Sequence, residues 1–144
     1  MCTQKGITVI LLVPPELQMH WYVNAFKNYA VFSGRAGRAE YWTFFLISML
    51  MYICLHVIFM VSDSRAVAGS IEAVYVVSHF IPTLAIGSRR LHDTGRSGWW
   101  QLILVVPIVG PIALLVLLAR AGIGGHNAYG PEPQLVSRRH QQNG

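Results

Sequence analysis

The stretch YWTFFLISMLMYICLHVIFMV, residues 41–61, determines which class of protein this chain can form. It carries no formal charge, and its polar side chains are those of Thr43, Ser48 and His56. At about 1.5 Å of rise per residue, a helix of this length crosses a hydrocarbon layer of about 30 Å. We therefore expect a transmembrane helix at residues 41–61.

The composition of the whole chain also indicates lipid as its solvent. Hydrophobic residues make up 53% of the 144 residues and charged residues only 12%, about half the charged share of soluble domains. The net charge is +5, and the basic residues lie beside apolar segments. This position favours anionic lipid headgroups over nucleic acid as the partner. The two cysteines, Cys2 and Cys54, have no disulfide or zinc-binding spacing, and we expect no metal and no cofactor.

A second span is predicted at residues 66–86. The segment is less apolar than the first because it contains Glu72, His79 and Pro82. Its length and its runs of β-branched residues still fit a membrane helix, since neighbouring helices can cover the backbone that a proline loosens.

A third span is predicted at residues 99–119, where Gln101 supplies the polar side chain. The sequence PIVGP at residues 107–111 interrupts this segment. Proline lacks a backbone donor and clashes with the preceding helical turn. We therefore predict a kinked full span, with a re-entrant hairpin as the alternative.

A short helix is expected before the first span, at residues 21–32. The apolar residues of WYVNAFKNYAVF have helical spacing, and its aromatic residues and lysine suit a helix in the membrane interface. The alternative is a helix that packs on the bundle of the protein itself. The predicted fold is an all-α membrane protein with three transmembrane helices and this short N-terminal interfacial helix.

The two ends of the chain differ from the three-span membrane domain, which we place at residues 19–133. Residues 1–18 contain a short apolar run without a signal-peptide cleavage site. We favour Met19 as the biological start, and the alternatives are a functional leader or a tail without a role. Residues 134–144 are expected to be disordered because they lack a sustained hydrophobic period.

Basic residues indicate how the spans are oriented. The segment before the first span and the second loop each carry three basic residues, whereas the first loop carries only Arg65. These six residues are Lys27, Arg35, Arg38, Arg89, Arg90 and Arg96. Because Lys and Arg retain loops in the cytoplasm, we expect a multi-pass membrane protein with a cytoplasmic N-terminus. Three full spans place the C-terminal tail outside, whereas a re-entrant hairpin returns it to the cytoplasm.

The loop RRLHDTGRSGWW, residues 89–100, contributes most of the predicted binding site. Guanidinium groups bind phosphate through paired hydrogen bonds, and tryptophan rings prefer the level of the lipid headgroups. The predicted site consists of Arg35, Arg38, Arg89, Arg90, Arg96, Trp99 and Trp100. It would bind anionic lipid or a partner protein, and the alternative is a topology signal with non-specific lipid attraction. The local patterns GRAG (34–37) and GRSG (95–98) suggest two similar turns.

Two further hypotheses use other residues. Ionisable groups are costly inside a membrane, so His56, Glu72 and His79 could line the path of a small transporter or channel subunit. Three helices enclose little pore, so that function would need a homo-oligomer or another membrane protein. His92 and Asp93 could act as acid and base on phospholipid headgroups, although Asp93 more readily pairs with an arginine or caps a turn. We expect no enzymatic activity, because the chain contains no recognisable catalytic motif.

Four stretches together resemble one known family. They are WYVNAFKNYAVFSGRAGRAEYW, RRLHDTGRSGWW, P-x-x-G-P and GHNAYGPEP, and they extend over residues 21–133. Their order and spacing resemble the YhaH/YhaI-like small inner-membrane proteins of bacteria, domain-of-unknown-function family 805. The resemblance implies a three-span protein of the bacterial inner membrane that begins close to Met19, and it implies no reaction.

Overall fold

The computed structural model describes residues 15–133, and within this range the chain forms helices and turns but no strand. The five helices, in chain order, are α2 (Pro15–Lys27), α3 (Arg38–Val61), α4 (Arg65–Asp93), the 3-10 helix η1 (Gly98–Val105) and α5 (Val109–Ala119). The predicted all-α class is confirmed. Most of the predicted leader and the predicted disordered tail lie outside the described residues.

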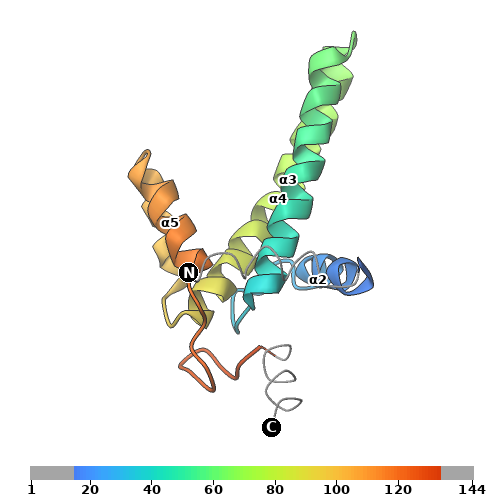
Figure 1. Cartoon of the computed structure of the whole chain (residues 1–144). Coiled ribbons are helices and arrows are strands. Elements are labelled where there is room, and N and C mark those ends of the chain that lie inside the picture. Colours follow the sequence, from blue (N-terminus) through green and yellow to red (C-terminus); the bar gives the residue numbers. More distant parts are fainter. Residues whose placement is uncertain (1–14, 134–144) are drawn as a thin grey trace, which may run out of the picture.

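The two long helices, α3 and α4, form an antiparallel pair joined by a short turn (Figure 1). They contain 24 and 29 residues, which corresponds to lengths of about 36 and 44 Å. Both are long and apolar enough to cross a membrane. The structure therefore has helices at the first two predicted spans, and α4 continues beyond residue 86 to Asp93.

The predicted third span is not a continuous helix. η1 and α5 are joined by a turn in which Ile108 has a φ of 66°, a conformation that is costly for a β-branched residue. With eight and eleven residues, the two helices are each about 16 Å long, half the thickness of a hydrocarbon layer. The three-helix prediction is thus not confirmed, and the re-entrant alternative describes this segment (Figure 1).

The turn of this hairpin depends on prolines and one glycine. Pro107 and Pro111 supply no backbone N–H, so fewer donors need partners where the chain reverses. The N–H of Gly110 donates to the carbonyl of Val106 at 2.9 Å. A side chain at Gly110 would overlap the carbonyl oxygen of Ile103. The PIVGP sequence therefore produces a tight reversal rather than a kink.

Helix α2 lies across the base of the α3/α4 pair (Figure 1). The rings of Tyr22 and Phe26 pack on Phe44 with centroid distances of 5.5 and 6.0 Å. Trp21 and Ala25 are buried. One face of α2 therefore packs on the protein, as the alternative prediction proposed.

The bounds of α2 differ from the predicted helix at residues 21–32. The helix begins at Pro15 and thus includes residues that we assigned to the leader, and it ends at Lys27. Its other face exposes Met19 and Val23, so apolar side chains of this helix remain accessible to lipid.

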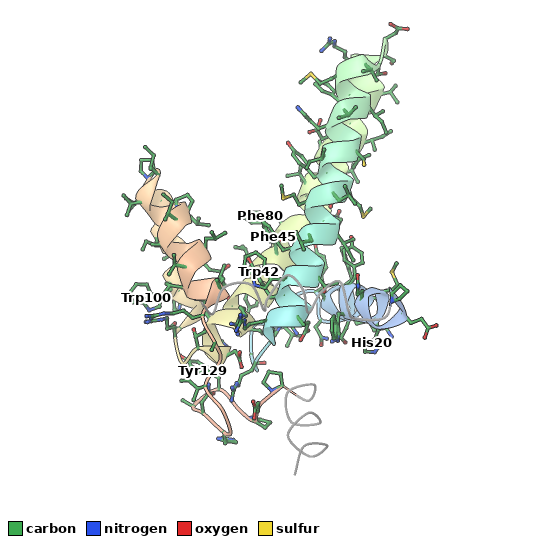
Figure 2. The ribbon with its side chains drawn as sticks, viewed as in Figure 1. His20, Trp42, Phe45, Phe80, Trp100 and Tyr129 are labelled. Carbon is green, nitrogen blue, oxygen red and sulfur yellow. The ribbon has the colours of Figure 1, made fainter. Side chains whose placement is uncertain are left out.

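The protein core lies at the base, where α2, both ends of the hairpin and the adjoining ends of α3 and α4 meet. The buried cluster consists of Ala25, Ala36, Tyr41, Phe44, Ile86, Leu91, Leu114 and Leu118. Every residue of α4 from Ala85 to Leu91 is buried. Away from the base, the side chains of α3, α4 and α5 extend outward from the ribbons (Figure 2). Among the described residues, the side chains that are buried by other parts of the protein therefore lie mainly at the base.

Candidate functional site

A buried network of charges occupies the base of the molecule, with Asp93 at its centre. Its Oδ1 atom accepts hydrogen bonds from Arg35 Nη2 and Nε at 2.8 and 3.0 Å, and Oδ2 accepts one from Arg90 Nη1. The side chains of Arg35 and Arg90 are 1% and 0% exposed. One carboxylate thus faces two buried guanidinium groups, and the remaining donors need other acceptors.

Backbone carbonyls of the C-terminal part supply those acceptors. Arg90 donates to the carbonyl oxygens of Leu118, at 2.9 Å, and Arg120. Arg35 donates to three carbonyls of the segment that follows α5. These belong to Ile123, Gly125 and Gly130. The network therefore holds the segment after α5 on the same side of the α3/α4 pair as the N-terminal loop.

The side chain of His92 has different partners from those of Asp93. Its ring stacks on Tyr129 at a centroid distance of 3.9 Å, and its Nδ1 atom lies 3.1 Å from the carbonyl oxygen of Gly34. Asn127 donates to the backbone carbonyl of His92 at 2.9 Å. The prediction that Asp93 pairs with arginine is confirmed, and within residues 15–133 no hydrogen bond joins the His92 and Asp93 side chains.

Arg89 and Arg38 are less completely paired. Arg89 Nη1 lies 3.7 Å from Glu40 Oε1, and the Nε and Nη2 atoms of Arg89 are buried without a partner in the described part of the chain. Arg38 forms no ion pair within residues 15–133 and lies close enough to Arg90 to repel it electrostatically. These two residues add positive charge to the base.

Trp99 and Trp100 line an open pocket, and Arg96 lies against Trp100 beside it. The Arg96 guanidinium lies over the Trp100 ring, 5.6 Å from its centroid. Trp99 and Trp100 are 78% and 46% exposed. With Ser97 and Ile103 they line a pocket of about 320 Å³. Of the seven predicted binding residues, Trp99 and Trp100 therefore share one accessible surface, and the half-buried Arg96 lies behind it with its Nε atom buried and without a partner in the described part of the chain.

The two loops contain similar turns, as their GRAG and GRSG patterns suggested. Gly34 and Gly95 have φ angles of 85° and 74°, values that glycine adopts readily. The arginines that follow them differ in surroundings, since Arg35 is buried against Asp93 and Arg96 lies on Trp100. A shared local turn therefore does not give the arginines a shared role.

Gln101 anchors the hairpin to α4, a role that we did not predict. Its amide nitrogen donates to Ser88 Oγ at 2.7 Å and to the carbonyl oxygen of Leu84 at 3.1 Å. A side chain at Gly87 would lie 2.7 Å from Gln101 Oε1. The sequence did contain a sign of this role, namely a single amide side chain within an apolar segment. An amide in such surroundings needs hydrogen-bond partners.

The polar residues of the long helices form two separate groups. His56 Nδ1 lies 3.0 Å from Glu72 Oε1, whereas His79 Nε2 lies 2.9 Å from the hydroxyl of Tyr22. Burial raises the pKa of Tyr22 above its ordinary value, so this hydroxyl stays protonated at neutral pH. His79 is therefore tied to helix α2 and lies apart from the His56–Glu72 pair.

No group of three or more His, Cys, Asp and Glu side chains that could hold a metal ion is found among the described residues. The base therefore contains an internal charge network, and an open pocket lined by two tryptophans lies next to Arg96.

Comparisons with known proteins agree with this architecture. The family described as protein of unknown function (DUF805) matches residues 29–131. Inner membrane protein YhaI of Escherichia coli (strain K12) is 42% identical over 119 residues, which cover 83% of this chain and 99% of the relative. Inner membrane protein YhaH of the same strain is 40% identical over 119 residues, with 81% and 98% covered.

A third relative, Uncharacterized protein YiiR of Escherichia coli (strain K12), is 28% identical over 130 residues, covering 73% of this chain and 87% of the relative. No solved structure matches the chain. The family match covers the loops, the hairpin and the C-terminal segment that together build the base. The chain therefore belongs to the DUF805 family, as its motifs indicated.

Proposed function

We propose that the chain is a multi-pass protein of the bacterial inner membrane whose Arg96–Trp99–Trp100 pocket binds the headgroup of an anionic phospholipid. The single observation that carries this proposal is the Arg96 guanidinium over the exposed Trp100 ring at the edge of an open pocket. Tryptophan rings prefer the headgroup level, and a guanidinium forms strong hydrogen bonds to phosphate.

The arrangement of the base supports a cytoplasmic position for this pocket. Two helices that cross the membrane return the chain to its starting side, and the hairpin extends over half of a hydrocarbon layer and turns back. The N-terminal loop and the C-terminal segment meet at the Arg35–Asp93–Arg90 network. Because the basic residues gather at this end, the positive-inside rule places it in the cytoplasm.

Arg35 and Arg90 have a structural role in this proposal. Their donors are directed to Asp93 and to backbone carbonyls, so they hold the fold that presents the pocket. Arg38 and Arg96, which are both half-buried and form no ion pair within residues 15–133, contribute positive charge near the surface. The attraction of each such residue to an anionic membrane surface is about 1 kcal/mol.

Lipid retention tests the proposed site. The purified chain would be placed in nanodiscs of phosphatidylethanolamine with phosphatidylglycerol or cardiolipin, and bound lipids counted by native mass spectrometry. We expect Arg96→Gln to lower the affinity for the anionic lipid about fivefold, the equivalent of about 1 kcal/mol. Trp100→Ala should have a similar effect because it removes the ring on which Arg96 lies.

Arg65→Gln is the matched control for this experiment. The Arg65 guanidinium lies over the Phe59 ring at 5.7 Å, in the same kind of contact but at the opposite end of the helix pair. It should leave retention of the anionic lipid unchanged. Equal retention by the wild type and Arg96→Gln would overturn the proposed lipid site.

Reporter fusions test the orientation. A cytoplasmic reporter such as green fluorescent protein should be active at either end of the chain, and a periplasmic phosphatase should be inactive at both. A C-terminus in the periplasm would contradict the hairpin and support three full spans.

A further inference from the structure

One pair of ionisable side chains lies in the otherwise apolar outer parts of α3 and α4. His56 and Glu72 are 3.0 Å apart, and their side chains are 42% and 16% exposed. The exposed ring of Tyr52 stacks on His56 with a centroid distance of 5.9 Å. His56 precedes the end of α3 at Val61 by five residues, or about 7–8 Å along the helix. In a membrane-crossing α3, this group lies within the hydrocarbon layer.

No other described element of the chain covers this polar group. α2 lies across the base, and the hairpin rises from the base over about 16 Å, half of the hydrocarbon layer (Figure 1). Polar side chains that face lipid at this depth are costly, and membrane helices cover them by associating with other helices. The exposed side of the His56–Glu72 pair therefore indicates an intermolecular contact.

We propose that a second copy of this chain covers the pair in a two-fold symmetric dimer. Four side chains follow one flank of α3 at helical spacing, and these are Met49, Tyr52, His56 and Met60. His56 Nδ1 lies 3.0 Å from Glu72 Oε1, and the Tyr52 side chain also hydrogen-bonds Glu72. This leaves His56 Nε2 and the remaining lone pairs of the Glu72 carboxylate for a further bond.

A patch that combines the Nε2 atom of a protonated His56 with the remaining lone pairs of a Glu72 carboxylate is complementary to itself. In a two-fold dimer each Nε2–H donates to the partner's carboxylate, and both bonds form at once. A partner of different sequence would have to supply both a donor and an acceptor at the matching positions, so the charge pattern favours a second copy. This inference rests on the crossing of the membrane by α3 and α4, which is part of the proposed function.

Disulfide cross-linking in native membranes tests the dimer. In a chain with Cys2→Ser and Cys54→Ala, Met60→Cys places a thiol on the proposed contact flank. Ile58→Cys places the matched thiol on the other side of α3, at a residue of similar exposure. After oxidation with copper phenanthroline we expect a dimer from Met60→Cys in several-fold higher yield than from Ile58→Cys.

A second variant tests the role of the charged pair. Glu72→Gln in the Met60→Cys chain should lower the dimer yield several-fold, whereas Asp63→Asn, in the exposed turn between the helices, should leave it unchanged. Equal yields from residues 58 and 60, no dimer from either, or a yield insensitive to Glu72→Gln would each overturn the proposal.

Membrane fractionation and lipid retention, measured on the same chains, separate this test from the test of the proposed function. A chain that stays in the membrane and retains anionic lipid without cross-linking at residue 60 overturns the dimer alone. A chain that is released as a soluble protein overturns the membrane orientation, and with it both proposals.

Discussion

The two halves of α4 have different surroundings. In the outer half, residues 65–81, most side chains are exposed, and the contacts of this half are chiefly with α3. In the inner half, residues 82–93, most side chains are buried by the N-terminal loop, the hairpin and the C-terminal segment. The same helix is therefore packed against protein at one end and presents its surface to lipid at the other.

This difference shows how the helix tolerates charge at two positions. In the inner half, Arg90 and Asp93 have protein partners on several sides. In the outer half, Glu72 pairs with His56 and the pair stays open on one side. The inner charges stabilise the fold of this chain, whereas the outer pair is suited to contact with a second chain.

The largest expected effect comes from removing the shared carboxylate of the inner half. Asp93→Asn leaves the buried Arg35 and Arg90 guanidinium groups without their counter-charge and should destabilise the fold by about 3–5 kcal/mol. Chemical unfolding of the purified chain in detergent measures this change. Asp63→Asn, in an exposed turn, should change the stability by less than about 0.5 kcal/mol. A loss below about 1 kcal/mol for Asp93→Asn would show that the network does not hold the base together.

A smaller loss of stability is expected from disturbing the hairpin that packs on the inner half of α4. Gly110→Ala inserts a methyl group against the carbonyl of Ile103 and should cost about 1–3 kcal/mol. The same unfolding assay applies. Gly124→Ala is the control, because a side chain there meets no atom within 4 Å. Equal stability of the two variants would contradict the close packing of η1 and α5.

The contact between His92 and the C-terminal segment should contribute less to the stability of the fold than the hairpin turn does. Tyr129→Ala removes the ring stacked on His92 and should destabilise the fold by about 0.5–1.5 kcal/mol. Tyr129→Phe keeps the ring and should remain close to the wild type. If the two variants lose the same stability, the stacked rings do not stabilise this contact.

The smallest effect is expected in the outer half of α4. Val77→Ala truncates a side chain that is 71% exposed and should change the stability by less than about 0.5 kcal/mol. Leu91→Ala, in the buried inner half, is the positive control and should cost about 2–5 kcal/mol. Comparable losses at both positions would contradict the division of α4 into a lipid-exposed and a protein-packed half.

Part of the site could be predicted from the sequence because it depends on local chemistry. The pairing of Asp93 with an arginine was one of the two roles predicted for this residue, and the two similar turns followed from their shared glycine–arginine pattern. The division of the arginines into buried and accessible groups could not be predicted. Arg35 and Asp93 are 58 residues apart, and no local pattern shows that they meet.

The hairpin, too, could be predicted only in part from the sequence. The sequence contained the interruption at residues 107–111 but did not decide between a kink and a reversal, because proline permits both. Gln101, which binds Ser88 and Leu84, and Gly110, which packs on Ile103, favour the reversed arrangement in the folded chain. These contacts exist once the segment has folded back beside α4.

The sequence by itself determined the helical class and the two long apolar helices, since helix length and apolarity are properties of neighbouring residues. The tertiary structure decided that the third apolar segment turns back, which arginines are buried, and which one remains on an exposed tryptophan. Those outcomes depend on contacts between distant parts of the chain, where each buried donor must find an acceptor and each close approach needs a residue small enough to allow it.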